Sequence, residues 1–332
     1  MGAINGKNSL AKKLPKIIKE IRNNPPAPVN YAYQKNISYS QMSIFRGCPH
    51  RWKLQYKDKI KRFTSSIHTV FGTAIHEVIQ NYLDVAYESS FAAADREINM
   101  EDKFQQTFID EYQKQYKSNK NEHFSSATEM REFFEDGIGI LNWFKKKRSA
   151  YFSKKGTYLV GCEIPIVIAP NKMYNNVLYM GYLDVVTYHE ATDTFKIIDI
   201  KTSTRGWRDQ DKKNEDKQFQ LLLYKQYFSE QYNIPLEKIE IEFFILKRKV
   251  LDWDDENLMS PHQAYRVQTF TPPSGKIKLG RAKNAINSFI NECFNSSGQI
   301  KDADYPKSPS KWNCNFCPYK EDQEHCGEGI IY

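Results

Sequence analysis

GYLDVVTYHEATDTFKIIDIKT, residues 181–202, is the stretch that decides the fold, because it predicts a β-hairpin. Both flanks are rich in Val, Ile, Tyr and Thr, which favour strands, and a polar turn separates them. A symmetric turn places Asp184 directly opposite Asp199. Because side chains alternate along a strand, Asp199 and Lys201 share one face, while the isoleucines beside them point to the other. Two carboxylates and a lysine are therefore expected to converge.

This convergence of charge suggests a bound cation. Charged groups on an otherwise apolar strand are costly unless they bind something. Oxygen ligands from Asp184 and Asp199 suit Mg2+ or Mn2+, and Lys201 would orient an attacking water or offset developing negative charge. The alternative is a solvated hairpin with one surface ion pair. The hairpin alone does not decide between the two.

Length and charge limit the classes of protein that fit. With 332 residues and 40% hydrophobic content, the chain can bury a large core, in one elaborated domain or two closely joined ones. The net charge is +8, but residues 1–36 supply +6 of it, from six Lys and one Arg against Glu20. No apolar run reaches membrane-spanning length and no apolar signal core follows the N-terminus. We therefore expect a cytoplasmic protein, bacterial or viral in its host, without a membrane partner.

Residues 1–36 are interpreted as a basic, mobile N-terminal appendage. They contain a short amphipathic stretch, 10–21, followed by a helix-breaking run, 23–28. Docking on a protein partner or along DNA phosphates is the alternative to a mobile tail.

Helical patterns follow. Ser38 or Ser40 is expected to cap a first helix, and residues 71–83 form a second one with a buried apolar stripe. His76 lies beside that stripe, where a structural role and a metal-ligand role both remain open. Residues 89–152 are predicted to be a helical insertion, because their apolar positions recur at steps of three and four.

The pattern then changes to strands, at 158–169, in the hairpin, at 239–250 and at 264–270. Mixed periodicity of this kind indicates an α/β or α+β fold. A charged segment, 203–216, is predicted to be a mobile loop. In the helix after it, Gln220 and Tyr224 lie one turn apart on one face.

The C-terminal region carries a cysteine motif. Cys314 and Cys317 form a Cys-x2-Cys pair, Cys326 follows, and Cys48 precedes a proline far upstream. In an intracellular chain, such a pair favours metal or redox chemistry over structural disulfides. Three clustered thiolates need a fourth ligand, for which Cys48 is the candidate. Zinc and an iron-sulfur cluster both satisfy the count, and spacing does not choose between them.

The order of these elements carries a family resemblance. They are Cys48, His76, Gly181-Tyr182-Leu183-Asp184, Asp199-Ile200-Lys201, Gln220-Leu221-Leu222-Leu223-Tyr224, Cys314, Cys317 and Cys326. This order resembles the RecB-type branch of the PD-(D/E)XK nuclease superfamily, and more narrowly its iron-sulfur members. Those are the CRISPR adaptation exonuclease family, the AddB nuclease domain and single-chain exonucleases of viruses and mitochondria. The resemblance runs from about residue 37 to residue 326.

The resemblance implies an α/β fold with a restriction-endonuclease-like core, in which helices flank a central mixed sheet. Residues 37–332 would form this nuclease domain, with a helical insertion at about 89–152 and a cysteine-rich clasp at about 306–327.

The resemblance also implies the roles of the hairpin residues. His76, Asp184 and Asp199, with the Ile200 carbonyl, would bind Mg2+ or Mn2+, and Lys201 would be catalytic. Asp199 is one departure, since many relatives have Glu there.

Two further groups of residues carry roles over from the resemblance. Gln220 and Tyr224 match a motif that supports the active site and nucleic-acid contacts. Cys48, Cys314, Cys317 and Cys326 would hold a 4Fe-4S cluster that joins the two ends of the chain.

The resulting hypothesis is a metal-dependent DNA exonuclease acting on free single-stranded ends, in recombination, repair or phage and CRISPR-type DNA processing. The alternatives are a structure-selective or single-strand endonuclease of the same fold, and a non-catalytic DNA-binding subunit. The latter would be expected to lack a metal ligand or the lysine. A zinc-stabilised structural protein would leave the charged hairpin unexplained.

Overall fold

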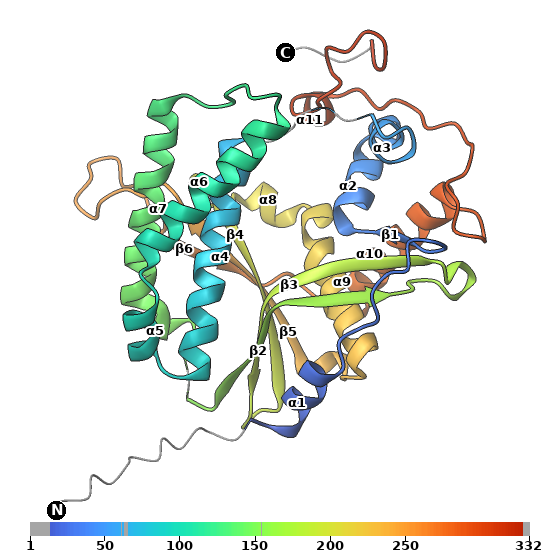
Figure 1. The fold of residues 1–332 in the computed structure, drawn as a ribbon. Helices are drawn as coiled ribbons and strands as arrows, with labels where there is room; N and C mark the ends of the chain where they lie inside the picture. The colour runs from blue at the N-terminus through green and yellow to red at the C-terminus, as the bar shows by residue number, and fades with distance from the viewer. Residues whose placement is uncertain (1–13, 61, 63–65, 154, 328–332) are drawn as a thin grey trace, which may run out of the picture.

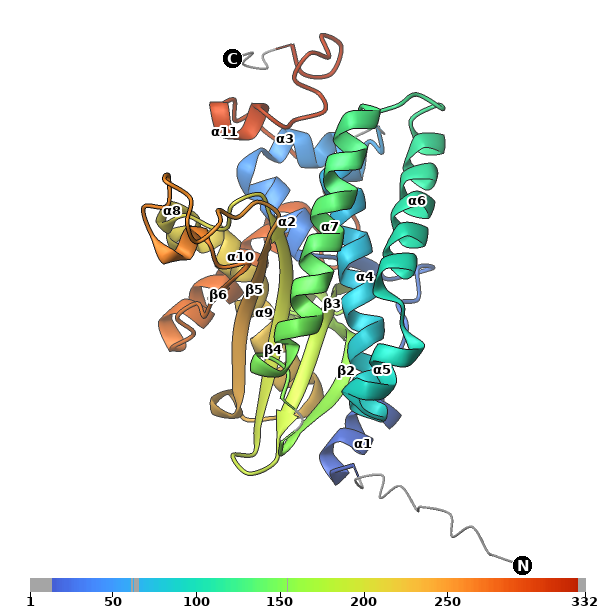
Figure 2. The ribbon, with the colours of Figure 1, turned by 90° about the vertical axis from the view of Figure 1, so that its left-hand side faces the viewer.

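The computed structural model describes residues 14–60, 62, 66–153 and 155–327, and its centre is a six-stranded mixed sheet between two layers of helices (Figures 1 and 2). The strands are β1 (Lys35–Ile37), β2 (Thr157–Ile168), β3 (Val177–His189), β4 (Thr194–Ser203), β5 (Ile239–Lys247) and β6 (Val267–Phe270). The helices are α1 (Lys16–Asn23), α2 (Tyr39–Gly47), α3 (Pro49–Trp52), α4 (Ile67–Glu88), α5 (Phe91–Glu97), α6 (Met100–Ser118), α7 (Ala127–Lys147), α8 (Asp209–Lys213), α9 (Glu215–Tyr232), α10 (Lys276–Cys293) and α11 (Lys311–Cys314).

Strand β3 organises the sheet. Antiparallel β2 pairs along one edge of β3, while parallel β1 and antiparallel β4 share its other edge. The β3–β4 ladder runs from His189–Thr194 to Val185–Ile198 and goes no further. Strand β4 continues past this point in parallel pairing with β5. The two strands of the central hairpin therefore separate at the positions of Asp184 and Asp199.

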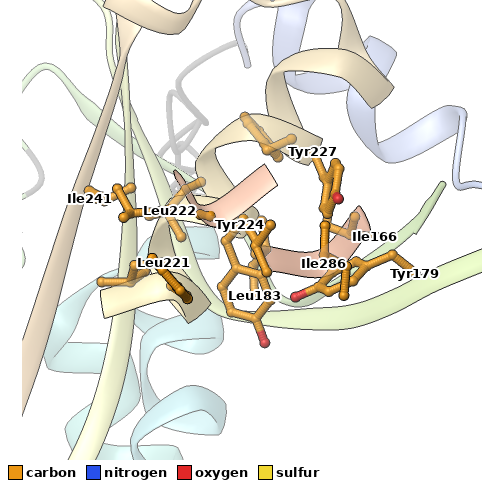
Figure 3. Close-up of a cluster of buried hydrophobic side chains, with 14 of the residues drawn as sticks. Ile166, Tyr179, Leu183, Leu221, Leu222, Tyr224, Tyr227, Ile241 and Ile286 are labelled. Atoms are coloured by element: carbon orange, nitrogen blue, oxygen red, sulfur yellow. The ribbon is translucent and has the colours of Figure 1, made fainter. Parts of the chain in front are cut away.

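The helical layers bury the two faces of the sheet separately. Helices α4 to α7 pack on one face, in a cluster that includes Ile198 and Ile200 of β4. Helices α1, α2, α9 and α10 pack on the other face, against residues such as Leu183 and Ile241. Figure 3 shows α9 side chains, among them Leu222 and Tyr224, within this second cluster. Because α9 is covered by the sheet on one side and by other helices on the other, three consecutive leucines can all be buried.

The expected elements are confirmed, with shifted ends. The predicted hairpin register is confirmed, since Val185 opposite Ile198 is the register that sets Asp184 opposite Asp199. Ser38 caps α2, its hydroxyl accepting a hydrogen bond from the Gln41 amide at 3.3 Å. The predicted helical insertion forms α5, α6 and α7.

The charged segment 203–216 differs from the predicted mobile loop. It contains α8, and Asn214 caps α9 by accepting hydrogen bonds from the Asp216 and Lys217 amides. The Trp207 ring packs on Phe243 of β5, with centroids 4.7 Å apart. Packing of this half-buried ring, with hydrogen bonds between the Trp207 backbone and Gln268, anchors a segment whose composition is that of a solvated loop.

The structure differs from the predicted mobile appendage at α1 and β1, and residues 1–13 lie outside the described part. Helix α1 buries Ile18 and Ile21 in the core. Arg22 donates hydrogen bonds at 2.9 Å to the carbonyls of Leu159 and Val160 in β2. Strand β1 pairs with β3. The amphipathic stretch noted in the sequence thus contributes to a helix whose two isoleucines pack in the core. None of the helices in the described ranges combines the length and apolar character needed to cross a membrane.

Replacing Ile18 tests this docking. Ile18→Ala removes a side chain that is 0% exposed, so we expect the free energy of unfolding to fall by about 2–5 kcal/mol in urea denaturation. Lys19→Ala, at an exposed position of the same helix, is the control and should change it by less than about 0.5 kcal/mol. Equal stability of the two variants would mean that α1 is detached.

Candidate active site

The site lies where β3 and β4 separate. Because pairing with β3 has ended, the Ile200 amide of β4 donates its hydrogen bond to the Asp184 carboxylate, with nitrogen and Oδ2 2.7 Å apart. A side chain thus replaces the missing ladder bond and holds the two strands at a fixed distance. Asp184 is thereby fixed against the backbone of the Asp199-Ile200-Lys201 segment.

Asp199 is the charged group of the site whose hydrogen-bonding capacity is least satisfied. It is 1% exposed, and Lys201 Nζ lies 2.7 Å from its Oδ2. Apart from this ion pair, neither Asp199 oxygen accepts a hydrogen bond from the described residues. A buried carboxylate with so few donors is costly unless a cation completes its environment. The chemistry of these oxygens fits a hard divalent ion.

Burial and neighbouring charges shift the pKa values of Asp184, Asp199 and Lys201. Burial, then the neighbouring Asp199 charge, raises the pKa of Asp184 well above its usual range. Burial also raises the pKa of Asp199, although Lys201 opposes this. For Lys201, burial acts to lower the pKa, but the Asp199 and Asp184 charges outweigh it and the pKa is raised. Lys201 is therefore a cation at neutral pH.

His76 enters the site from α4, on the opposite side from α9. Its Nδ1 lies 3.6 Å from Asp184 Oδ2, and the ring lies beside the Ile200 backbone. Burial and the Lys201 charge lower its pKa to about 4. The imidazole is therefore neutral at physiological pH and keeps a lone pair that can bind a metal.

Gln220 and Tyr224 reach the site from α9. Gln220 Nε2 donates to the Tyr224 hydroxyl at 3.3 Å. The Tyr224 ring packs so closely on Gly181 that a Cβ at this position would lie 2.7 Å from the ring. Burial and the nearby Asp199 charge raise the pKa of Tyr224, which stays a neutral phenol. This contact accounts for the glycine in the Gly-Tyr-Leu-Asp segment.

Two neighbours of Asp184 were not singled out from the sequence. Gln80 of α4 is buried, and its Nε2 donates to the Asp184 carbonyl at 3.1 Å and to Glu163 Oε1 at 2.6 Å. Glu163 lies in β2, and its charge contributes to the raised pKa of Asp184. Gln80 lies one helical turn after His76, which is the signal that could have identified it.

The cysteines predicted to act together line one pocket. Cys48, at the start of α3, meets Cys314, Cys317 and Cys326 across a pocket that Arg51, Tyr319 and others also line. Cys293 is buried elsewhere, and Cys162 lies in β2. The structure therefore brings together the four thiols proposed from the sequence and leaves out the other two.

Hydrogen bonds also hold the C-terminal segment to the region of α2 and α3. Asn313 Nδ2 donates to the Gly47 carbonyl at 2.6 Å, and the Tyr319 hydroxyl donates to the Ile60 carbonyl at 2.5 Å. Asp322 pairs with Arg62 and with His325. Asp322, Glu324 and His325 place their ligand atoms within 4.8 Å of one another, but Arg62 already pairs with the half-buried Asp322 carboxylate.

The fold is a mixed sheet with helices on both faces. An acidic pair and a lysine lie where two of its strands separate. This combination is typical of a class of α/β proteins that are nucleases. The model of the PD-(D/E)XK nuclease superfamily matches residues 36–321, and the chain belongs to this superfamily. Its members are metal-dependent nucleases that use ions such as Mg2+ or Mn2+, and DNA is the substrate that the family implies. No curated protein matches the chain.

The raised carboxyl pKa values predict how cation binding depends on pH. A carboxyl with a raised pKa keeps its proton to a higher pH, so a cation competes with protons more successfully as the pH rises. His76, with a pKa of about 4, stays neutral and does not contribute above pH ~5. We therefore expect Mn2+ to raise the unfolding temperature more at pH 8 than at pH 6. About 100-fold excess over the Kd would add about 2.7 kcal/mol.

The matched control for this measurement is Asp302→Asn, which changes an exposed carboxylate that pairs with Lys57. It should keep the Mn2+ shift, whereas Asp199→Asn should lose it. A shift that is the same at both pH values, or that survives in Asp199→Asn, would contradict the assignment.

Proposed function

We propose that this protein is a metal-dependent DNA exonuclease that hydrolyses phosphodiester bonds from free single-stranded ends. The observation that supports it best is Asp199, a buried carboxylate that has no hydrogen-bond donor other than Lys201 among the described residues. Processing of DNA in recombination, repair or phage and CRISPR-type systems is the role that we infer.

The residues present fit a divalent cation. Asp184 and Asp199, with His76 and the Ile200 carbonyl, would hold Mg2+ or Mn2+, because they combine two carboxylates, a neutral imidazole and a backbone oxygen. Such an ion, when bound, neutralises charge on the phosphate and makes a coordinated water more acidic. The protein supplies orientation, since the Ile200 amide fixes the Asp184 carboxylate.

Lys201 acts as a cation in this proposal. Since its pKa is raised, it is protonated in the resting site and cannot accept a proton from water. Its ammonium group instead orients the water and offsets negative charge that develops on the phosphate. The ion pair with Asp199 keeps it at the end of β4.

Tyr224 and Gln220 position the substrate. The Tyr224 phenol accepts from Gln220 and keeps its own proton, which it can donate to a phosphate oxygen. Because Gly181 lets the ring lie against β3, the phenol has little freedom to turn away.

The requirement for a free end rests on the path of the chain. Trp52 of α3 packs in one helical layer and Ile67 of α4 packs in the other, so the chain passes between the layers after α3. Arg62 pairs with Asp322 and thereby ties this part of the chain to the C-terminal segment. In this proposal, a strand that reaches the site between the two joined layers has to thread from a terminus. A closed circle would be excluded.

Digestion of labelled DNA tests the proposed activity. We expect the protein to degrade linear single strands with Mg2+ or Mn2+, and to leave covalently closed circles of the same sequence intact. Equal initial rates on linear and circular strands would contradict the exonuclease assignment and favour the endonuclease alternative.

Lys201→Ala should reduce the rate by about 10²-fold or more, as expected when a charge-stabilising group is lost, without loss of DNA binding. Lys196→Ala, on the same strand but paired with Glu242, is the matched control and should cleave normally. Undiminished cleavage by Lys201→Ala would contradict its role. If the unmodified protein binds DNA and never cleaves it, the non-catalytic alternative holds.

We further propose that Cys48, Cys314, Cys317 and Cys326 hold a 4Fe-4S cluster. Cys48, Cys314, Cys317 and Cys326 all line one pocket. This shared pocket supports the proposal, because a 4Fe-4S cluster takes four cysteine thiolates as its ligands.

Metal analysis tests the cluster. Protein purified without oxygen should be brown and contain about four iron and four sulfide per chain. Cys326→Ala should lose iron and unfold at a lower temperature, since the cluster closes a loop of nearly the whole chain. Cys162→Ala, which removes a thiol outside the pocket, should keep its iron. A colourless protein with one zinc per chain would contradict the proposal.

A further inference from the structure

A third carboxylate belongs to the row that crosses the site. In the β2–β3 ladder, Cys162 pairs with Val185 and Ile164 pairs with Leu183. This register sets Glu163 opposite Asp184, as the β3–β4 register sets Asp184 opposite Asp199. Three acidic residues on three neighbouring strands therefore lie in line.

The backbone at Glu163 is unusual for a strand. Its φ is +52°, in the left-handed region that residues with a side chain rarely adopt. The ladder shifts register a few residues earlier, between Leu159 and Gly161, which marks a β-bulge. Arg22 of α1 donates to the carbonyls of Leu159 and Val160 at this shift. Bulges next to active sites often redirect a side chain.

The positive φ of Glu163 does not bury its side chain in the core, because this side chain is exposed. Hydrogen bonding to Gln80 nevertheless fixes the position of the carboxylate. Gln80, which is 8% exposed, donates from one amide nitrogen to Glu163 Oε1 at 2.6 Å and to the Asp184 carbonyl at 3.1 Å. This amide ties Glu163 to the part of β3 that carries Asp184.

An independent observation indicates a ligand at this row. Asp199 is almost fully buried, and apart from Lys201 its oxygens meet no donor in the described part of the chain. When ionised, the three carboxylates carry three negative charges and Lys201 carries one positive charge, while His76 is neutral. The net charge of −2 matches one divalent cation.

We propose that Glu163 is a further ligand of the divalent cation held by Asp184 and Asp199, and that Gln80 is its positioning residue. The inference rests on the proposed function, because it concerns the same metal site. The bulge directs the carboxylate toward the row, and Gln80 holds it there. Loss of either residue weakens cation binding without unfolding the protein.

Direct Mn2+ binding tests the inference without DNA or turnover. Free Mn2+ is measured by electron paramagnetic resonance as it is titrated into the full chain at pH 7.5. Glu163→Gln removes the charge but keeps an oxygen that can accept from Gln80. We expect a 10-fold to 100-fold weaker Mn2+ affinity, and an unchanged unfolding temperature without metal. Gln80→Met, which removes the donor, should weaken binding in the same direction.

The matched control is Glu190→Gln, which changes an exposed glutamate that also accepts one side-chain hydrogen bond, from Tyr158 at 3.0 Å. It should bind Mn2+ as the unmodified chain does. If Glu163→Gln also binds Mn2+ normally while Asp199→Asn does not, the role of Glu163 is overturned and the proposed function stands. If the unmodified chain and Asp199→Asn bind Mn2+ equally, both are overturned.

Discussion

The structure depends on one hydrogen bond, from the Ile200 amide to the Asp184 carboxylate. Strands β3 and β4 stop pairing after Val185 and Ile198, and each strand would otherwise leave backbone groups unpaired in a buried region. The Asp184 side chain satisfies one of them. The strands can therefore separate without losing a bond at the point of separation, and the opening is where the charged groups lie.

The opening lets both helical layers contribute to one site. Strand separation exposes Asp184 to His76 from α4, while Tyr224 approaches from α9 on the other side. As a consequence, the buried Asp199 carboxylate has only Lys201 as a partner, which is energetically costly. In a metal-dependent nuclease of this superfamily, that unfavourable arrangement is expected, because a bound cation would supply the missing interactions. The pocket lined by the four cysteines is separate from this opening and lies where the C-terminal segment meets the region of α3.

Sequence reasoning predicted the features that depend on local periodicity. The hairpin register and the helical insertion follow from alternation and spacing. The grouping of Cys48 with the C-terminal cysteines follows instead from the need of three thiolates for a fourth ligand. It failed where tertiary burial overrides composition. The basic α1 is packed through two isoleucines, and Trp207 anchors a charged segment on β5. Glu163 was missed because a β-bulge breaks the alternation from which facing residues are read.

The central claim is that Asp184 and Asp199 share one divalent cation. A crystal of the protein grown with Mn2+, measured for anomalous scattering at the manganese edge, tests it most directly. The account predicts an anomalous peak within about 2.5 Å of a carboxylate oxygen from each aspartate, a distance typical of bound metal ions. Full Mn2+ occupancy elsewhere, with Asp199 bonded only to Lys201, would contradict it.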